Sequence, residues 1–171
     1  IADVAESDLL RLVIHYRLDR NKLKTLSRYM SSYSKNGSVK STLNTSLNMF
    51  NIRSIKKKIF HKKLIFPEKK FNSRLKYKFD QLNLLTSKVM DAVKLGSSTY
   101  VAELYLMLVD SYGQLASEIQ KFTPKGKGPD YVKSFKAAMA KVYSPLHMEI
   151  KKLRSEGRNL VSSKNLFSEK G

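Results

Sequence analysis

Apolar residues recur every three or four positions along almost the whole chain, the spacing that places side chains on one face of an α-helix. Three of these series are Leu23, Leu26, Met30 and Tyr33, then Val39, Leu43, Leu47 and Phe50, then Leu82, Leu85, Val89 and Val93. No segment sustains the alternation that is typical of a β-strand. The pattern predicts an all-α protein of antiparallel helical hairpins, arranged as an α-solenoid-like array or an irregular helical bundle.

The longest apolar series lies between residues 101 and 122. Its members are Val101, Leu104, Leu108, Tyr112, Leu115, Ile119 and Phe122. They form one continuous stripe along a helix of about six turns. We expect this stripe to be buried, because a helix is stabilised mainly by the packing of its apolar face.

Polar residues and glycines mark the ends of the expected helices. A capping-box variant, an aspartate with a glutamate three residues later, opens a first helix over residues 3–18, and a second helix follows Asp19. The turn residues 36–38 start a third helix. Residues 94–99 combine a helix-closing glycine with hydroxyl residues that cap the next helix. The two helices on either side of residues 94–99 are therefore expected to form an antiparallel hairpin.

Two prolines and two glycines lie between residues 123 and 130, which predicts a loop. Beyond it, Pro145 either kinks a helix or stands in the first turn of a new helix capped by Ser144. The last apolar series is Leu146, Ile150, Leu153, Leu160 and Phe167. We expect a single helical domain, with N-terminal helices in 1–66, a long hairpin in 68–122, the loop 123–130 and C-terminal helices in 131–168.

The charge balance points to anionic partners. The 171 residues include 33 lysines and arginines against 14 acids, a formal net charge of +19. Nucleic acid, anionic lipid head groups, acidic cell-wall polymers and acidic proteins all fit, and a lysine-rich composition without any ligand is the alternative. Cysteine is absent, which excludes disulfides and thiolate metal sites. No apolar run is long enough to span a bilayer, and the chain begins at Ile1, so we expect a processed protein or a fragment of a longer chain.

Cations are most concentrated between residues 53 and 78, where Glu68 is the single acid. The cations are Arg53, Lys56, Lys57, Lys58, Lys62, Lys63, Lys69, Lys70, Arg74, Lys76 and Lys78. All of these except Lys76 and Lys78 are predicted to form the basic face that binds a partner, and the alternative is that the lysines only line a solvated face. The interleaved aromatic residues are Phe60, Phe66, Phe71, Tyr77 and Phe79. They suit stacking on nucleic-acid bases, but we interpret them as core residues.

Residues with catalytic chemistry are scattered. His15, His61 and His147 lack metal-ligand spacing, and the acids sit singly on the expected helices. The glycine-lysine residues 124–128 lack the spacing of a phosphate-binding loop and follow no strand, so they are interpreted as a linker. We therefore expect a non-enzymatic protein that holds neither a cofactor nor a metal.

Residues 102–116 resemble the first helix of a tetratricopeptide-type repeat, in which an aliphatic residue and a tyrosine four positions later, here Leu108 and Tyr112, pack between neighbouring helices. The linker and the later Tyr131, Phe135, Pro145 and Leu146 are similar to the helix-closing region of envelope-associated arrays in bacteria. The resemblance covers residues 77–167. It implies a scaffold that holds peptides or partner proteins on helical faces, as in a bacterial envelope assembly.

Three functions are compatible with these features. The leading hypothesis is a non-enzymatic helical scaffold for protein–protein interaction, with a basic face for an acidic partner. The second is backbone-directed, sequence-nonspecific nucleic-acid binding, because lysine lacks the bidentate geometry of arginine and no helix-turn-helix, zinc-finger or RNP motif is present. The third is a peripheral membrane or cell-wall attachment module, although Pro67 interrupts the basic amphipathic stretch.

Overall fold

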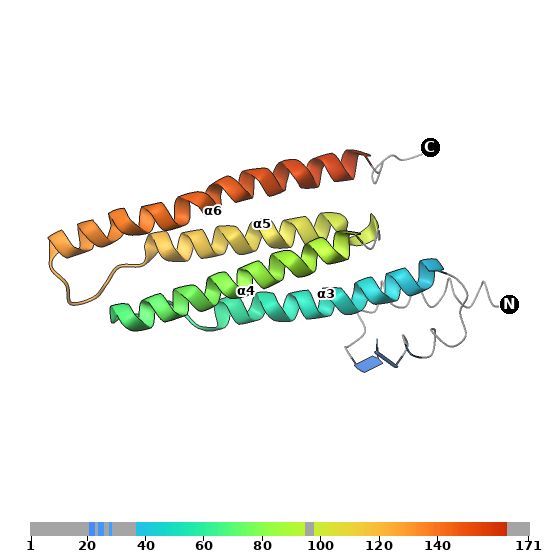
Figure 1. Ribbon diagram of the computed structural model, residues 1–171, viewed down its shortest axis with the longest axis horizontal. Helices are drawn as coiled ribbons and strands as arrows, with labels where there is room; N and C mark the ends of the chain where they lie inside the picture. Colours follow the sequence, from blue (N-terminus) through green and yellow to red (C-terminus); the bar gives the residue numbers. More distant parts are fainter. Residues whose placement is uncertain (1–20, 23, 26–27, 29–36, 95–97, 164–171) are drawn as a thin grey trace.

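The computed structural model describes residues 21–22, 24–25, 28, 37–94 and 98–163, and these residues form helices joined by short loops (Figure 1). The long helices are α3 (Gly37–His61), α4 (Glu68–Lys94), α5 (Ser98–Lys121) and α6 (Pro129–Ser163). The described residues contain no strand, so the all-α prediction is confirmed. The helix predicted over residues 3–18 lies outside the described residues.

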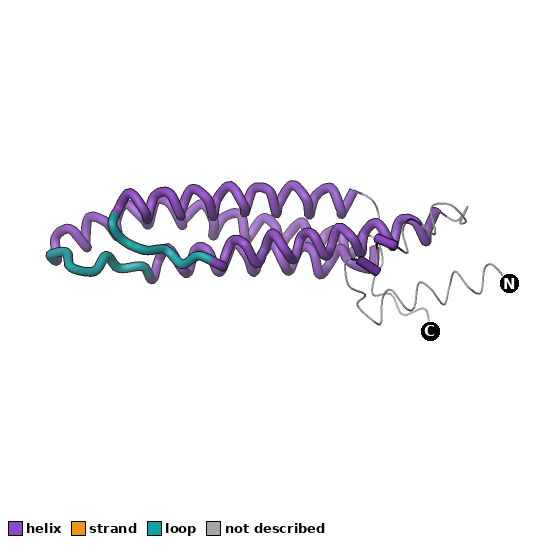
Figure 2. The backbone as a smooth tube through the Cα atoms, turned by 90° about the horizontal axis from the view of Figure 1, so that it is seen from below, coloured by secondary structure: helices purple, strands orange, loops and turns teal. Residues whose placement is uncertain are grey.

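The helices run antiparallel in chain order and lie side by side as α3, α4, α5 and α6 (Figure 1). Each packs on the helix that follows it, and the contact between α5 and α6 is the most extensive. The connections 62–67 and 122–128 lie at the same end of the molecule (Figure 2). Helices α4 and α5 lie on either side of residues 95–97, and the loop 122–128 overlaps the segment 123–130 where a loop was predicted.

The apolar stripe of α5 forms the centre of the core, as predicted. Leu104, Leu108 and Leu115 are fully buried, and Phe122 at the end of the stripe is half-buried. Burying each such side chain contributes about 1.5–3 kcal/mol relative to exposure. On α4 the core is continued by Phe71, Leu75, Leu82, Leu85, Val89 and Ala92. The helical spacing predicted these positions correctly, because a helix with neighbours on both sides buries the residues of its apolar stripe.

The apolar stripe predicted for α3 is wrong at Phe50, which is 39% exposed, whereas Met49 and Ile52 are buried. The physical reason is the position of α3 at the edge of the row of helices (Figure 1). An edge helix buries only the side that faces its neighbours, so a large apolar residue next to that side stays in contact with water.

Aromatic rings hold the loop end of the molecule together. The ring centroid of Phe71 on α4 lies 4.7 Å from that of Phe122 and 5.2 Å from that of Phe135 on α6. Phe66 in the first loop contacts Tyr131 edge-on at 6.3 Å. Such ring pairs stabilise the fold beyond the burial of their apolar surface. Both loops are therefore fixed against the same group of aromatic rings.

Helix α6 runs without interruption through Pro145, so this proline does not start a new helix. Its missing N–H leaves the carbonyl of Lys141 without the usual helical donor. Gly157 allows α6 to approach α5 closely, since a Cβ atom at this position would lie 3.1 Å from the Cβ of Tyr105. In the loop before α6, Gly126 has a φ of 72°, a conformation that favours glycine.

Candidate functional site

The basic segment spans the second half of α3, the loop to α4 and the first half of α4. The structure divides its cations into two groups. One group contacts acids or backbone carbonyls of the protein itself, and the other extends into solvent. The division decides which of the predicted residues are accessible to a partner.

Two cations of α3 pair with acids of α5. The guanidinium Nη2 of Arg53 lies 2.5 Å from the carboxylate of Glu103. One helical turn later, the ammonium of Lys56 donates a hydrogen bond to the carboxylate of Asp110. This hydrogen bond holds the pKa of Asp110 below its usual value. Arg53 and Lys56 therefore join α3 to α5.

Lys78 is a buried cation inside the bundle, with only 1% of its side chain exposed. Its ammonium Nζ lies 2.9 Å from the carboxylate of Glu118 on α5 and donates a hydrogen bond of 2.6 Å to the carbonyl of Ile59. It also lies 5.4 Å from the ring centroid of Phe60. Burying a charge is costly unless it is paired and hydrogen-bonded, and these contacts supply both conditions.

The end of α3 is closed by cations that belong to α4. The last four carbonyls of a helix lack partners within the helix, and the dipole makes this end negative. Lys78 binds the carbonyl of Ile59 in the last turn, and Arg74 donates a hydrogen bond of 2.6 Å to the carbonyl of Lys63 just beyond it. The same Glu118 that pairs with Lys78 accepts a hydrogen bond of 2.9 Å from the N–H of Leu64. Arg74 and Lys78 thus fix the loop and the helix end.

Arg53, Lys56 and Arg74, three of the predicted partner-binding residues, therefore have partners within the protein. In the sequence they cannot be told apart from their neighbours, because Glu103 and Asp110 follow about fifty residues later. We leave these three cations out of the candidate surface.

The exposed lysines gather around a hollow between α3 and α4. The hollow measures about 260 Å³ and is lined by Ser54, Lys57, Lys58, His61, Lys62 and Tyr77. No carboxylate lines it. The three lysines form no ion pair with any acid in the part of the chain that the structure describes. The arrangement offers ammonium groups and hydroxyl groups to an anionic group, without an acid to compete.

Tyr77 is the residue of this surface that sequence reasoning misjudged. We interpreted it as a core residue, but it is 39% exposed, whereas Phe71 on the same helix is fully buried. Lys70 precedes Tyr77 by two helical turns, so the two lie on the same face of α4. Lys69 and Lys76 are also exposed, and Lys63 lies elsewhere, at a hollow on the side of α5. The hydroxyls of Ser54 and Tyr77 at a basic hollow give no signal in a single sequence.

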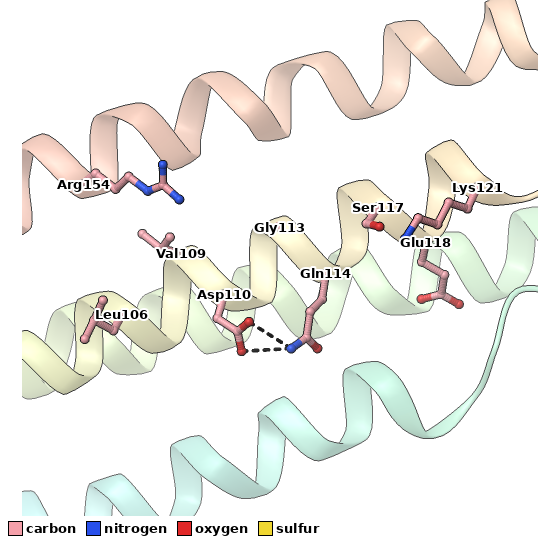
Figure 3. Close-up of a pocket in the computed structure, with 9 residues that line it drawn as sticks. All are labelled: Leu106, Val109, Asp110, Gly113, Gln114, Ser117, Glu118, Lys121 and Arg154. Carbon is pink, nitrogen blue, oxygen red and sulfur yellow. Dashed lines mark hydrogen bonds between the residues drawn. The ribbon is translucent and has the colours of Figure 1, made fainter.

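A larger hollow of about 720 Å³ lies along α5 and is lined mainly by residues of this helix (Figure 3). Two of its residues, Asp110 and Gln114, are joined by hydrogen bonds of 2.9 and 3.0 Å. Arg154 reaches toward it from α6 (Figure 3).

The described residues include no group of three histidines or acids placed to hold a metal ion. Within the same residues, no helix is both long and apolar enough to cross a membrane. The chain matches no known family model, and no curated protein sequence or solved structure is significantly similar to it. The relation to tetratricopeptide-type repeats thus stays a prediction.

Proposed function

We propose that the protein is a non-enzymatic helical scaffold that binds an acidic partner protein. The contact is made through a basic surface, defined as Lys57, Lys58, Lys62 and Lys70 around Tyr77. The observation that carries this proposal is the hollow between α3 and α4, which three lysines line and no acid enters. An acidic side chain placed there gains several ammonium contacts at once.

The cost of this arrangement supports a binding role over a solvated face. Lys69 and Lys70 occupy the first turn of α4, where the helix dipole disfavours a cation by about 0.3–1 kcal/mol. Lys58 lies in the last turn of α3 and Lys62 follows the helix directly, and neither forms an ion pair in the part of the chain that the structure describes. Four other cations of the segment, Arg53, Lys56, Arg74 and Lys78, have acids or carbonyls as partners. A partner that supplies carboxylates offsets this cost.

An acidic protein fits this surface better than nucleic acid. The two arginines of the segment, which have the geometry for bidentate contacts with phosphates and bases, are held by Glu103 and by the carbonyl of Lys63. Tyr77 offers one exposed ring, whereas single-strand binding uses several stacking rings along a groove. Backbone-directed nucleic-acid binding and attachment to an anionic membrane are the alternatives that the test must separate.

The test compares two variants with the same change in charge. The surface variant carries Lys57→Gln, Lys58→Gln and Lys62→Gln. The control variant carries Lys133→Gln, Lys136→Gln and Lys141→Gln on the exposed side of α6. Both are expected to keep the native circular dichroism spectrum, because exposed lysines contribute little to stability. The native protein and both variants are titrated with polyglutamate, with duplex DNA and with vesicles that contain an anionic lipid.

Polyglutamate is expected to bind the native protein, and the surface variant is expected to weaken this binding about tenfold more than the control variant. Equal weakening by both variants would show that only net charge matters and would overturn the proposal. Tighter binding of DNA than of polyglutamate would favour the nucleic-acid alternative, in particular if the surface variant reduces the salt slope by about 0.9 for each lost phosphate contact. Binding to vesicles alone would favour the membrane alternative.

A further inference from the structure

Helix α5 keeps apolar side chains on a side that no other described helix covers. Leu106 is 68% exposed, whereas the other leucines of α5, Leu104, Leu108 and Leu115, are fully buried. It lines a groove of about 400 Å³ between α5 and α6, together with Ala102, Val109 and Gly157. Large apolar groups at the floor of a groove commonly mark a site for a partner.

This groove continues along α5. It shares Leu106, Val109 and Arg154 with the hollow shown in Figure 3. That hollow in turn shares Gln114 and Lys121 with a third hollow, which lies beside the end of α3. From Ala102 to Lys121, α5 rises about 30 Å. Ala102, Gly113 and Ser117 along the floor are small, so the backbone of another helix can approach closely. The groove has the length that suits a helix of about five turns, with an apolar floor between Ala102 and Val109 and a mostly polar lining from Asp110 to Lys121.

The unpaired charges at the edge of the groove are positive. Its acids already have partners, since Asp110 pairs with Lys56 and Glu118 pairs with Lys78. Arg154, Arg158 and Lys121 form no ion pair within the part of the chain that the structure describes. Figure 3 shows the guanidinium of Arg154 extending from α6 toward Val109 on α5. An occupant therefore meets an apolar floor around Leu106 and a cationic rim.

We propose that this groove docks an amphipathic helix of a partner protein. Apolar residues of that helix, spaced by three and four, lie over Leu106 and Val109, and carboxylates on its flank contact Arg154 and Arg158. The groove is separate from the basic surface between α3 and α4, so this site does not depend on the function proposed above. A second copy of the chain fits poorly, because it brings a net charge of +19 to a rim that is already positive.

The probe is a synthetic amphipathic peptide of about 20 residues, with leucines spaced by three and four and glutamates on the flanks. A matched peptide has lysine in place of every glutamate. Binding is measured by fluorescence anisotropy with the whole chain. The groove variants are Leu106→Glu and the pair Arg154→Gln with Arg158→Gln. The controls are Met148→Glu, at a methionine of α6 that is 74% exposed outside the groove, and Lys151→Gln.

We expect the glutamate peptide to bind at least about tenfold more tightly than the lysine peptide. Leu106→Glu is expected to weaken it about tenfold or more, the double arginine variant severalfold, and Met148→Glu and Lys151→Gln within a factor of about two. The proposal fails if Leu106→Glu has no more effect than Met148→Glu, or if both peptides bind equally. It also fails if the Lys57, Lys58 and Lys62 variant abolishes peptide binding while Leu106→Glu leaves it intact. A dimer that Leu106→Glu dissociates, without peptide binding, would assign the groove to a second copy instead.

Discussion

Replacing Glu118 with glutamine is expected to destabilise the protein because it removes the counter-ion of a buried ammonium. Lys78 is 1% exposed, and its contacts are the Glu118 carboxylate and the Ile59 carbonyl. The glutamine keeps an oxygen that accepts the hydrogen bond from the N–H of Leu64, so the loop contact survives. The change therefore removes the negative charge and the acceptor that faces Lys78, while the hydrogen bond to Leu64 is kept.

The magnitude follows from the burial of the two partners. Breaking a buried ion pair costs about 3–5 kcal/mol, because the remaining charge has neither water nor a counter-ion. We expect about 3 kcal/mol for Glu118→Gln, at the lower end, since the carbonyl of Ile59 still accepts a hydrogen bond from the ammonium. Lys78→Met removes the buried charge itself and leaves a carboxylate that is 24% exposed and reaches water. Its cost is then about 1–3 kcal/mol, mainly from the unpaired carbonyl of Ile59.

Urea unfolding followed by circular dichroism measures both costs. Glu118→Gln should lower the free energy of unfolding more than Lys78→Met, and the double variant should be no less stable than Glu118→Gln alone. If Glu118→Gln costs under about 1 kcal/mol, water reaches Lys78 and the buried pair is not what we describe. A larger loss for Lys78→Met than for Glu118→Gln would show that Lys78 does not depend on Glu118 as its counter-ion.

Further predictions concern the core and the pH dependence. Leu108→Ala and Leu115→Ala should each lower the free energy of unfolding by about 2–5 kcal/mol in urea, and losses under about half a kcal/mol would mean that the stripe is exposed. Gly157→Ala should reduce the melting temperature although alanine favours helix, because its Cβ presses against Tyr105, and a rise would show that α6 can shift. The pKa of Asp110 is lowered in the folded state, so its contribution to stability is present above its usual pKa of 3.8 and is lost as the pH falls through the lowered value. Asp110→Asn should therefore flatten the loss of stability between about pH 5 and pH 2, as followed by urea unfolding at each pH.

The fold was predictable from the sequence where burial and helical spacing coincide. The stripe that includes Leu104 and Leu108 lies on a helix packed on both sides, so the spacing of the apolar residues predicts which side chains are buried. The loop after α5 was predictable because proline and glycine act on the local backbone. Phe50 and Tyr77 were misplaced because α3 and α4 expose apolar surface, which depends on the arrangement of helices rather than on local spacing.

The candidate site was predictable only as a region. The sequence placed the cations in one segment, but Lys78 and Lys58 look alike until α5 brings Glu118 to one of them. Pairing of this kind depends on residues about forty to fifty positions apart, and no local pattern encodes it. The groove over Leu106 was missed for the same reason, since the residues of α6 that line it follow about fifty positions later in the chain.

The most direct test of the central claim is to locate the footprint of an acidic ligand on the native protein. Polyglutamate is titrated at moderate salt, and the backbone amide signals are followed by nuclear magnetic resonance. Saturable shifts are expected at residues 54–62 and around Tyr77, with little change at the exposed lysines 133, 136 and 141 of α6. Shifts spread evenly over all exposed lysines would contradict that claim, because the basic segment would then be only a solvated face.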